Sequence, residues 1–384
     1  MNHHDVVIVS RARTPIGRFQ GAFVKKTAPE LGSVAIKSAI ERAGLTSNDI
    51  QEVIMGQVLT AGTGQAPARQ ASLGAEIPNS VPCMTINKVC GSGLKAVMLG
   101  AQSIQLGESQ IVVAGGMEPM SNTPYLLPKA RTGFRLGNSQ VVDAILQDGL
   151  LDPYSKTHMG VFGDQCASEF KFTREQQDAF AKRSYERALE AQKSGWFKDE
   201  IIPVEIENDE EPADFKPEKM PLLKPVFGKE GTVTAANASK ISDGAAAVIL
   251  MNAAESQRRG IKALAKIKAM ATYAQDPAHF TTAPIEAIRR VAKKAEISID
   301  DIDYFEINEA FSTVTMAAIE ALKLNPNHVN PWGGAVALGH PIGCSGARIL
   351  CTLLSVMARN QAKLGCAAIC LGGGEAVSVL IESV

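Results

Sequence analysis

The sequence predicts an α/β fold made of two similar halves, with a loop-rich insertion in the first half. Strand-like and helix-like segments alternate near both ends of the chain, which indicates a layered sheet covered by helices. Several short motifs of the first half recur in the same order in the second. Between them, Pro, Asn, Gly and charged residues replace the regular alternation. We therefore expect a first half of residues 1–118 plus 242–263, an insertion of 119–241 and a second half of 264–384.

In the first half, short apolar runs predict strands, and apolar residues at helical spacing predict helices. We expect strands over residues 6–10, 52–58, 82–86 and 110–114, and helices over 29–43, 66–73 and the segment after Cys90. Inside the insertion, Thr173 and Gln176 have capping-box spacing, and Gly195 suits the residue that follows a helix. These signals predict a long helix between Thr173 and Gly195, followed by an exposed loop over 208–224.

The regular pattern returns at residues 244–250 and continues to the end of the chain. We expect a helix after Thr282, a strand over 304–307, a helix over 347–357 and a strand over 367–371. The recurring motifs are Thr27-Ala28-Pro29 with Thr282-Ala283-Pro284, residues 43–50 with 295–302, Cys90-Gly91-Ser92-Gly93 with Gly343-Cys344-Ser345-Gly346, and Val113-Ala114-Gly115-Gly116 with Leu371-Gly372-Gly373-Gly374. Matches in register favour a duplication. The strand ends of both halves are then expected to face one cleft.

Composition excludes several classes of function. The 384 residues include 39 basic and 40 acidic side chains, so a net charge of −1 gives no general attraction to nucleic acid or to an anionic membrane. Apolar runs are too short to span a membrane, and a strand begins too early for a signal peptide, so we expect a cytoplasmic protein. The seven cysteines form no C-x-x-C pair, which argues against a metal site or a disulfide framework.

Cys90 is the strongest candidate for a catalytic residue. It lies between a predicted strand and a predicted helix, with Gly91 and Gly93 beside it. The first turn of a helix offers unpaired N–H groups and the positive end of the helix dipole, and both lower the pKa of a thiol. We therefore expect a reactive thiolate, with a buried structural cysteine as the common alternative.

Turns in the second half supply partners for Cys90. Asn308 follows a predicted strand, and His340 lies in a constrained turn with little side-chain cover, from which it can face a substrate. Cys370 and Gly372 end a strand, and bare N–H groups at such a glycine run can receive an oxyanion.

A cysteine, a histidine and a second cysteine suit covalent acyl transfer through a thioester. Imidazole can take the proton of the first thiol and later return it. The second thiol can act as an acid or a base. From spacing alone, a cysteine hydrolase fits equally well.

Taken together, the motifs resemble the thiolase family over essentially the whole chain. The matching segments, in family order, are residues 87–95, 115–121, 231–234, 308–311, 333–348 and 370–374. The resemblance implies a layered α-β-α-β-α core and an inserted loop domain that covers coenzyme A. It also implies a reversible Claisen condensation of two acetyl-CoA to acetoacetyl-CoA and CoA by a ping-pong mechanism. Family members of this kind are expected to be homotetramers, built as dimers of dimers.

The resemblance assigns a role to each candidate residue. Cys90 would carry the acyl group after activation by His340, and Cys370 would remove the α-proton of the second thioester. His340, with a water held by Asn308, would stabilise the enolate oxygen. The N–H groups of Cys90 and Gly372 would bind the thioester oxyanion. Coenzyme A thioesters are then substrates, and neither a cofactor nor a metal is expected.

The resemblance also indicates substrate-binding residues. As in short-chain members, Met159 would shorten the acyl pocket and His158 would lie beside the pantetheine. Ser239 would contact the pantetheine arm. Phe227 and Phe280 are expected in the pocket wall, where Phe280 departs from the usual family pattern.

Two further departures concern charge. Lys240 follows Ser239, where relatives carry a small residue. The stretch 209–219 is shortened and lacks the arginine that relatives direct at the nucleotide, so Lys224 is expected to replace it, with Lys216 and Lys219 as alternatives.

Two other functions stay open. A 3-ketoacyl-CoA thiolase of broader chain length, active in fatty-acid degradation, would use the same residues. An acyl-CoA-binding protein without turnover would keep the pocket, but binding alone would not need two cysteines at opposed turns.

Overall fold

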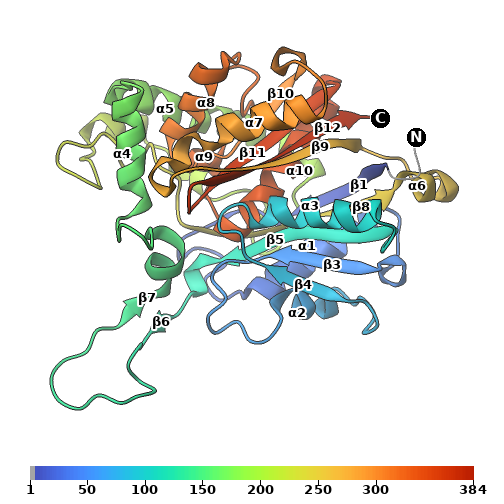
Figure 1. The fold of residues 1–384 in the computed structure, drawn as a ribbon, viewed down its shortest axis with the longest axis horizontal. Helices are drawn as coiled ribbons and strands as arrows, with labels where there is room; N and C mark the ends of the chain where they lie inside the picture. Colours follow the sequence, from blue (N-terminus) through green and yellow to red (C-terminus); the bar gives the residue numbers. More distant parts are fainter. Residues whose placement is uncertain (1–4) are drawn as a thin grey trace.

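A computed structural model describes residues 5–384 (Figure 1). The first half contains six strands and four helices: β1 (Val6–Arg13), β2 (Gly17–Arg18), α1 (Ala28–Arg42), β3 (Glu52–Gly56), α2 (Pro67–Gly74), β4 (Cys83–Ile86), α3 (Ser92–Gln105), β5 (Ile111–Pro119), β8 (Ser242–Asn252) and α6 (Ala253–Arg259). β8 follows the insertion in sequence and lies between β5 and β1 in the sheet. The chain therefore returns to the first half after residue 241.

The second half repeats this arrangement of strands and helices. Its elements are β9 (Ala265–Ala274), α7 (Ala283–Lys294), β10 (Tyr304–Ile307), α8 (Ser312–Leu322), α9 (Ala335–Leu338), α10 (Ile342–Asn360), β11 (Leu364–Leu371) and β12 (Glu375–Ser383). The predicted strand over 304–307 and the helix after Thr282 are confirmed.

Sheet topology confirms the duplication. The main sheet has the order β10-β11-β12-β9-β1-β8-β5-β3-β4, and β2 pairs with β8. Outward from the centre, β1-β8-β5-β3 matches β9-β12-β11-β10 in strand direction, and the last pair of each series, β5–β3 and β11–β10, is parallel. The first half adds a second parallel pair, β3–β4, at its edge. The halves join through a short antiparallel contact, Val7 with Lys266 and Ile8 with Ala265.

Helices form three layers around the two half-sheets, which confirms the α-β-α-β-α core (Figure 1). α1 and α2 cover one outer face and α7 and α8 the other, each over its own apolar cluster. α3 and α10 pack together between the half-sheets. A Cβ on Gly346 would lie 2.5 Å from the backbone nitrogen of Leu94, so this close helix contact requires glycine.

The central helix α10 corrects the predicted start at residue 347. It begins at Ile342, so Gly343, Cys344, Ser345 and Gly346 lie in its first turns and not in a loop. Glycine there serves close helix packing, which a local turn signal cannot reveal. Among residues 5–384, α10 is the one helix long and apolar enough to cross a membrane, and 89% of its apolar window is buried inside the protein.

The insertion joins β5 to β8. It contains a short hairpin of β6 (Tyr125–Leu126) and β7 (Val142–Asp143), then α4 (Met159–Glu169) and α5 (Arg174–Lys193). The predicted capping box of Thr173 and Gln176 is confirmed, and Gly195 adopts a left-handed φ of 67° after α5. The loop between β6 and β7 extends away from the body of the protein (Figure 1). The predicted loop over 208–224 contains two 3₁₀ turns, Glu211–Asp214 and Pro217–Leu222.

Candidate active site

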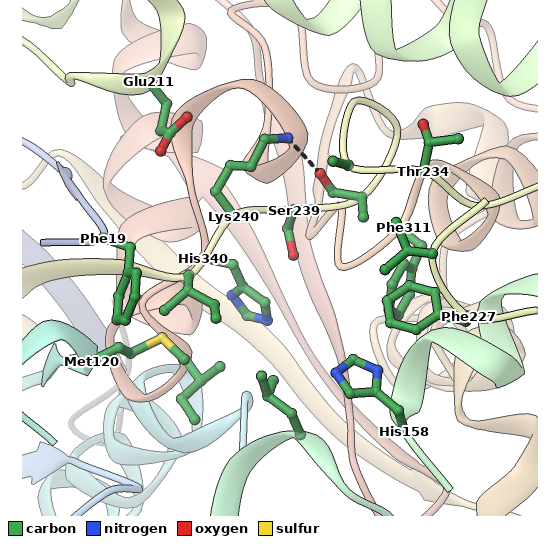
Figure 2. Close-up of a pocket in the computed structure, with 16 residues that line it drawn as sticks. Phe19, Met120, His158, Glu211, Phe227, Thr234, Ser239, Lys240, Phe311 and His340 are labelled. Atoms are coloured by element: carbon green, nitrogen blue, oxygen red, sulfur yellow. Dashed lines mark hydrogen bonds between the residues drawn. The ribbon is translucent and has the colours of Figure 1, made fainter. Parts of the chain in front are cut away.

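A pocket of about 410 Å³ opens where the insertion meets both halves (Figure 2). Its wall is mostly apolar, with a few polar groups that face one another across the space. The lining residues are Phe19, Met120, Leu150, His158, Glu211, Val226, Phe227, Thr234, Ala235, Ala238, Ser239, Lys240, Ile241, Phe311, His340 and Ile342. An apolar pocket with few convergent polar groups is typical of a small-molecule site.

Cys90 lies in a strained turn before α3. The preceding residue, Val89, has a left-handed φ of 45°, which a β-branched residue rarely adopts. The Val89 N–H donates to Asn87 Oδ1 at 2.9 Å, and Ser92 Oγ donates to the Val89 carbonyl at 2.6 Å. These bonds hold the unfavourable backbone in place, and strain of this kind clusters at functional sites.

Backbone donors from both halves surround the Cys90 sulfur. The N–H of Gly372 and the N–H of Cys90 itself both act to lower the pKa of the thiol. Burial nevertheless raises the pKa of the Cys90 thiol to about 12, and the charge of Glu118 acts in the same direction. The prediction of a lowered pKa is therefore wrong for this structure, because burial outweighs the backbone donors.

His340 is buried, with 6% of its surface exposed. The prediction of a histidine with little side-chain cover is therefore wrong. Burial, with the nearby charge of Arg348, lowers the pKa of His340 to about 3, so the imidazole is neutral near pH 7. Ser345 Oγ donates to the Pro341 carbonyl at 3.0 Å and lies 2.6 Å from His340 Nδ1. Because its proton is engaged, Ser345 Oγ accepts from Nδ1–H, and the free lone pair of His340 is on Nε2.

Asn308 lies next to that lone pair. Its Nδ2 is 3.4 Å from His340 Nε2, and the residue is fully buried at the end of β10. Asn308 Oδ1 has no hydrogen-bond partner among residues 5–384. The amide therefore retains an acceptor that faces the buried space around His340.

Glu309 fixes the strand end that carries Asn308. Its carboxylate accepts from Ser184 Oγ at 2.7 Å, from Asn330 Nδ2 at 2.8 Å and from the Val336 N–H at 3.1 Å. This buried group thus joins α5, β10 and α9. Asn308 and Glu309 therefore do more than cap the following helix. Asn308 lies beside His340, whereas Glu309 binds Ser184, Asn330 and the backbone of Val336.

Cys370 is fully buried near the end of β11. Burial raises its pKa well above the usual range, and the charge of a Cys90 thiolate would raise it further. The two cysteines thus enter the site from opposite halves of the duplicated fold. Both are protonated thiols in this structure near pH 7.

Three of the predicted substrate-binding residues line the pocket: His158, Phe227 and Ser239. The His158 and Phe227 rings stack with centroids 4.5 Å apart (Figure 2). Met159 is half-buried in the adjacent apolar cluster, where its methyl group is 3.8 Å from the position of a Cβ built on Gly372.

Phe280 and Lys224, like Met159, are not among the residues that line the pocket. Phe280 is 3% exposed and packs against Phe162 with centroids 6.2 Å apart, so the expectation of a pocket wall is wrong for it. It fills the apolar cluster behind the wall. Lys224 is exposed on the loop two residues before Val226, which lines the pocket, and its own side chain is not part of the lining. A lysine in a charged loop is typically solvated.

Sequence reasoning missed three polar residues of the site. Ser345 was placed in a predicted turn, Lys240 was noted only as an unusual residue, and Glu118 was given no role. Glu118 is fully buried at the end of β5 and accepts the N–H groups of Val58 at 2.9 Å, Leu59 at 3.1 Å and Gly343 at 2.9 Å. It therefore anchors the start of α10, and no local pattern in the sequence predicts that contact.

A duplicated five-layer fold whose two halves meet at a cysteine defines the class of protein. A crystal structure of Acat5 thiolase from Ascaris suum, in complex with coenzyme A, matches with a TM-score of 0.96 at 45% identity over 99% of this chain and 100% of that chain. The family models "Thiolase, N-terminal domain" and "Thiolase, C-terminal domain" match residues 6–254 and 261–383. The chain belongs to the thiolase family and is an enzyme of that family.

Curated relatives of similar length agree on one name. An acetyl-CoA acetyltransferase of Schizosaccharomyces pombe is 49% identical over 100% of both chains, and one of Cupriavidus necator is 50% identical over 98% of this chain and 99% of its own. A Gibberella zeae relative, 48% identical over 100% of this chain and 99% of its own, is named as a cytosolic acetyl-CoA acetyltransferase.

Proposed function

We propose that the chain is an acetyl-CoA acetyltransferase that condenses two acetyl-CoA to acetoacetyl-CoA and CoA, reversibly, through an S-acetyl intermediate on Cys90. The observation that carries this proposal is the pair of N–H donors, from Gly372 and Cys90, at the Cys90 sulfur. A thioester oxygen bound there places its carbonyl carbon beside the nucleophile. The names of the relatives support the choice of substrate.

In the first half-reaction the acetyl group moves to Cys90. His340 Nε2 takes the thiol proton as the sulfur bonds to the acetyl carbon, and the carbonyl oxygen becomes an oxyanion bound by the two N–H groups. The bond from carbon to the CoA sulfur then breaks, and that sulfur takes the proton from His340. Loss of one such donor typically costs about 3–4 kcal/mol in the transition state.

General-base assistance is needed because neither partner is charged at rest. With a thiol pKa of about 12 and an imidazole pKa of about 3, proton transfer from Cys90 to His340 before attack is unfavourable. Proton transfer during bond formation avoids the free thiolate. The neutral Nε2 lone pair defined by Ser345 and Asn308 is the form required.

In the second half-reaction Cys370 acts on the incoming acetyl-CoA. His340 first takes the proton of the Cys370 thiol. The Cys370 thiolate takes a proton from the methyl group, and the resulting carbon nucleophile attacks the acetyl carbon on Cys90. The carbon–sulfur bond to Cys90 breaks, and the Cys90 sulfur takes the proton held by His340, so both cysteines end as thiols. His340 and Asn308 lie where they can stabilise the enolate oxygen. Because CoA thioesters are consumed and released, they are substrates, and the proposal includes neither a cofactor nor a metal.

Exposed apolar surface supports a homotetramer. The loop joining β6 to β7 carries Phe134 at 47% exposure and Leu136 at 100%, far from the core (Figure 1). β4 is a sheet edge, and its Met84 is 46% exposed. Two separate apolar surfaces suit a dimer of dimers, since each can bury against its own copy. A cytoplasmic location follows the cytosolic name of one relative.

The test is thiolysis of acetoacetyl-CoA with CoA, by wild type and by Cys90→Ala, with intact mass measured after brief exposure to acetyl-CoA. We expect turnover and a single acetyl adduct on wild type only. Cys344→Ala, in a buried cysteine outside the pocket, is the matched control and should keep both. Free CoA without acetoacetyl-CoA would indicate a hydrolase, and binding without acylation would indicate a silent CoA-binding protein.

A further inference from the structure

Lys240 is the lysine in the wall of a mostly apolar pocket (Figure 2). It follows Ser239, lies beside His340 in the pocket lining, and is only partly exposed. The acyl-transfer steps above do not use it. A cation in such a place costs desolvation energy unless its partners offset that cost.

The ammonium group bridges two segments of the chain. Lys240 Nζ donates to the carbonyl of Ala238 at 2.9 Å and to the carbonyl of Val336 at 3.4 Å. It also lies 5.6 Å from the centroid of the Tyr185 ring, within reach of a cation–π interaction. Ala238 belongs to the segment that carries Ser239, whereas Val336 belongs to α9, just before His340.

The backbone of Lys240 makes a second link to the same place. Its carbonyl accepts the His340 N–H at 2.9 Å and Ser242 Oγ at 3.0 Å. Val336 itself is held at both of its backbone groups, because its carbonyl accepts from Lys240 Nζ and its N–H donates to the Glu309 carboxylate. The chain around His340 is therefore held by Lys240 from two directions.

The charge of Lys240 has few partners. Glu211, which lines the same pocket, is the acidic group that acts on it, and Tyr185 and His340 are the other titratable groups beside it. Burial lowers the pKa of Lys240 to about 8. Without the ammonium group, the carbonyls of Ala238 and Val336 would lose the donor that they share.

We propose that Lys240 is a positioning residue whose ammonium group aligns the pantetheine-binding segment, at Ala238 and Ser239, with the base His340. This inference rests on the proposed function, because alignment matters only if a thioester held along Ser239 must meet His340 and Cys90. Small errors in such alignment reduce the rate of the reaction more than they reduce binding.

The first test measures acetylation of Cys90 by acetyl-CoA, quenched at intervals and followed by intact mass. We expect Lys240→Met to lower the rate at saturating acetyl-CoA by roughly 10- to 100-fold, the range for a lost hydrogen bond to a charged group. The concentration for half-maximal rate should change little. Lys229→Met, in an exposed lysine of the insertion, should behave as wild type.

Chemical rescue separates charge from shape. Lys240→Ala leaves space where the side chain was, so ammonium chloride should restore part of its rate, whereas choline chloride at equal ionic strength should not. Lys240→Met fills that space with an apolar chain and should not respond to ammonium. The rate of wild type should fall as pH rises through about 8, and this fall should be absent in Lys240→Met.

Hydrogen exchange gives a result that does not depend on turnover. In Lys240→Met, amides of residues 333–341 should exchange faster, while those of α1 should not change. A wild-type rate in Lys240→Met, or a slow rate without rescue and without faster exchange, would overturn the proposal. A wild type that fails to acetylate but shows the exchange difference would reject the proposed function and keep the alignment role of Lys240.

Discussion

The backbone N–H of Gly372 lowers the pKa of the Cys90 thiol, although the two residues are far apart in sequence and belong to different halves of the fold. Cys90 precedes α3 and Gly372 follows β11, and both positions lie in motifs that recur between the halves. The duplicated fold thus brings a turn of the first half and a different turn of the second half to one site. One presents a thiol, and the other presents bare backbone donors.

Ser345→Ala should slow the reaction without unfolding the protein. Ser345 Oγ holds His340 Nδ1 at 2.6 Å, and without it the tautomer with a free Nε2 lone pair is no longer selected. We expect kcat for thiolysis to fall roughly 10- to 100-fold, the effect of about 1–3 kcal/mol from one buried polar group left unpaired, with KM nearly unchanged. Steady-state kinetics and the thermal midpoint measure the two effects. Cys344→Ala, one residue earlier and equally buried, is the control, and an equal loss in it would show that the effect is general to α10.

Asn308→Asp should create a pH dependence that wild type lacks. A carboxylate 3.4 Å from His340 Nε2 would stabilise the imidazolium form and raise the pKa of His340 from about 3. A protonated imidazole cannot accept the Cys90 proton, so the acetylation rate should be low in acid and rise as the imidazole loses its proton. Wild type should show no such step between pH 5 and 7 from His340. Asn308→Leu, which adds no charge, should lower the rate at all pH values alike, and a profile for Asn308→Asp that follows Asn308→Leu would contradict the prediction.

Local sequence signals predict the helices and strands whose defining contacts are between near neighbours. Features that depend on tertiary packing are not predicted by such signals. The capping box of Thr173 and Gln176 is a contact between near neighbours, so spacing was enough to predict it. The start of α10 was misplaced because Gly346 serves packing against Leu94, a contact across the duplication. The predicted direction of the Cys90 pKa shift is wrong because the sequence reveals only the local backbone donors, which lower the pKa. Burial raises it, and burial depends on the whole fold.

Met159→Ala should broaden the range of acyl chains. The Met159 methyl group lies 3.8 Å from the Cβ position of Gly372, so truncation opens space beside the donor that faces Cys90. Each methylene group that a pocket accommodates or excludes changes the transition-state free energy, and hence kcat/KM, by about 1–3 kcal/mol. We expect the ratio of kcat/KM for 3-ketohexanoyl-CoA to that for acetoacetyl-CoA to rise roughly tenfold or more. Phe280→Leu alters the same cluster behind the wall, so an equal rise in that variant would show that the change comes from loosened packing.

Arg348 and Glu306 form a buried ion pair behind His340. The loss of stability on substitution should depend on which of the two residues is replaced. Their side chains are each 1% exposed and 3.6 Å apart, without a hydrogen bond to other groups within residues 5–384. Burial raises the pKa of Glu306 well above its usual range, although Arg348 opposes that rise. Arg348→Met alone should therefore raise the pKa of Glu306 further, so that this buried carboxyl group must take up a proton on folding, and should cost about 3–5 kcal/mol of stability near neutral pH.

The pH dependence of this loss has a defined sign. A group whose pKa is raised on folding contributes stability below its unfolded pKa, and that contribution is lost as pH rises through the folded pKa. The destabilisation in Arg348→Met should thus be smaller at pH 5 than at pH 8, and the double variant Arg348→Met/Glu306→Gln should recover most of it. Urea unfolding of the two single variants and the double variant at both pH values measures the coupling. If the double variant loses as much stability as the sum of the singles at pH 8, the two side chains act independently, and the charge of Glu306 is balanced by a group other than Arg348.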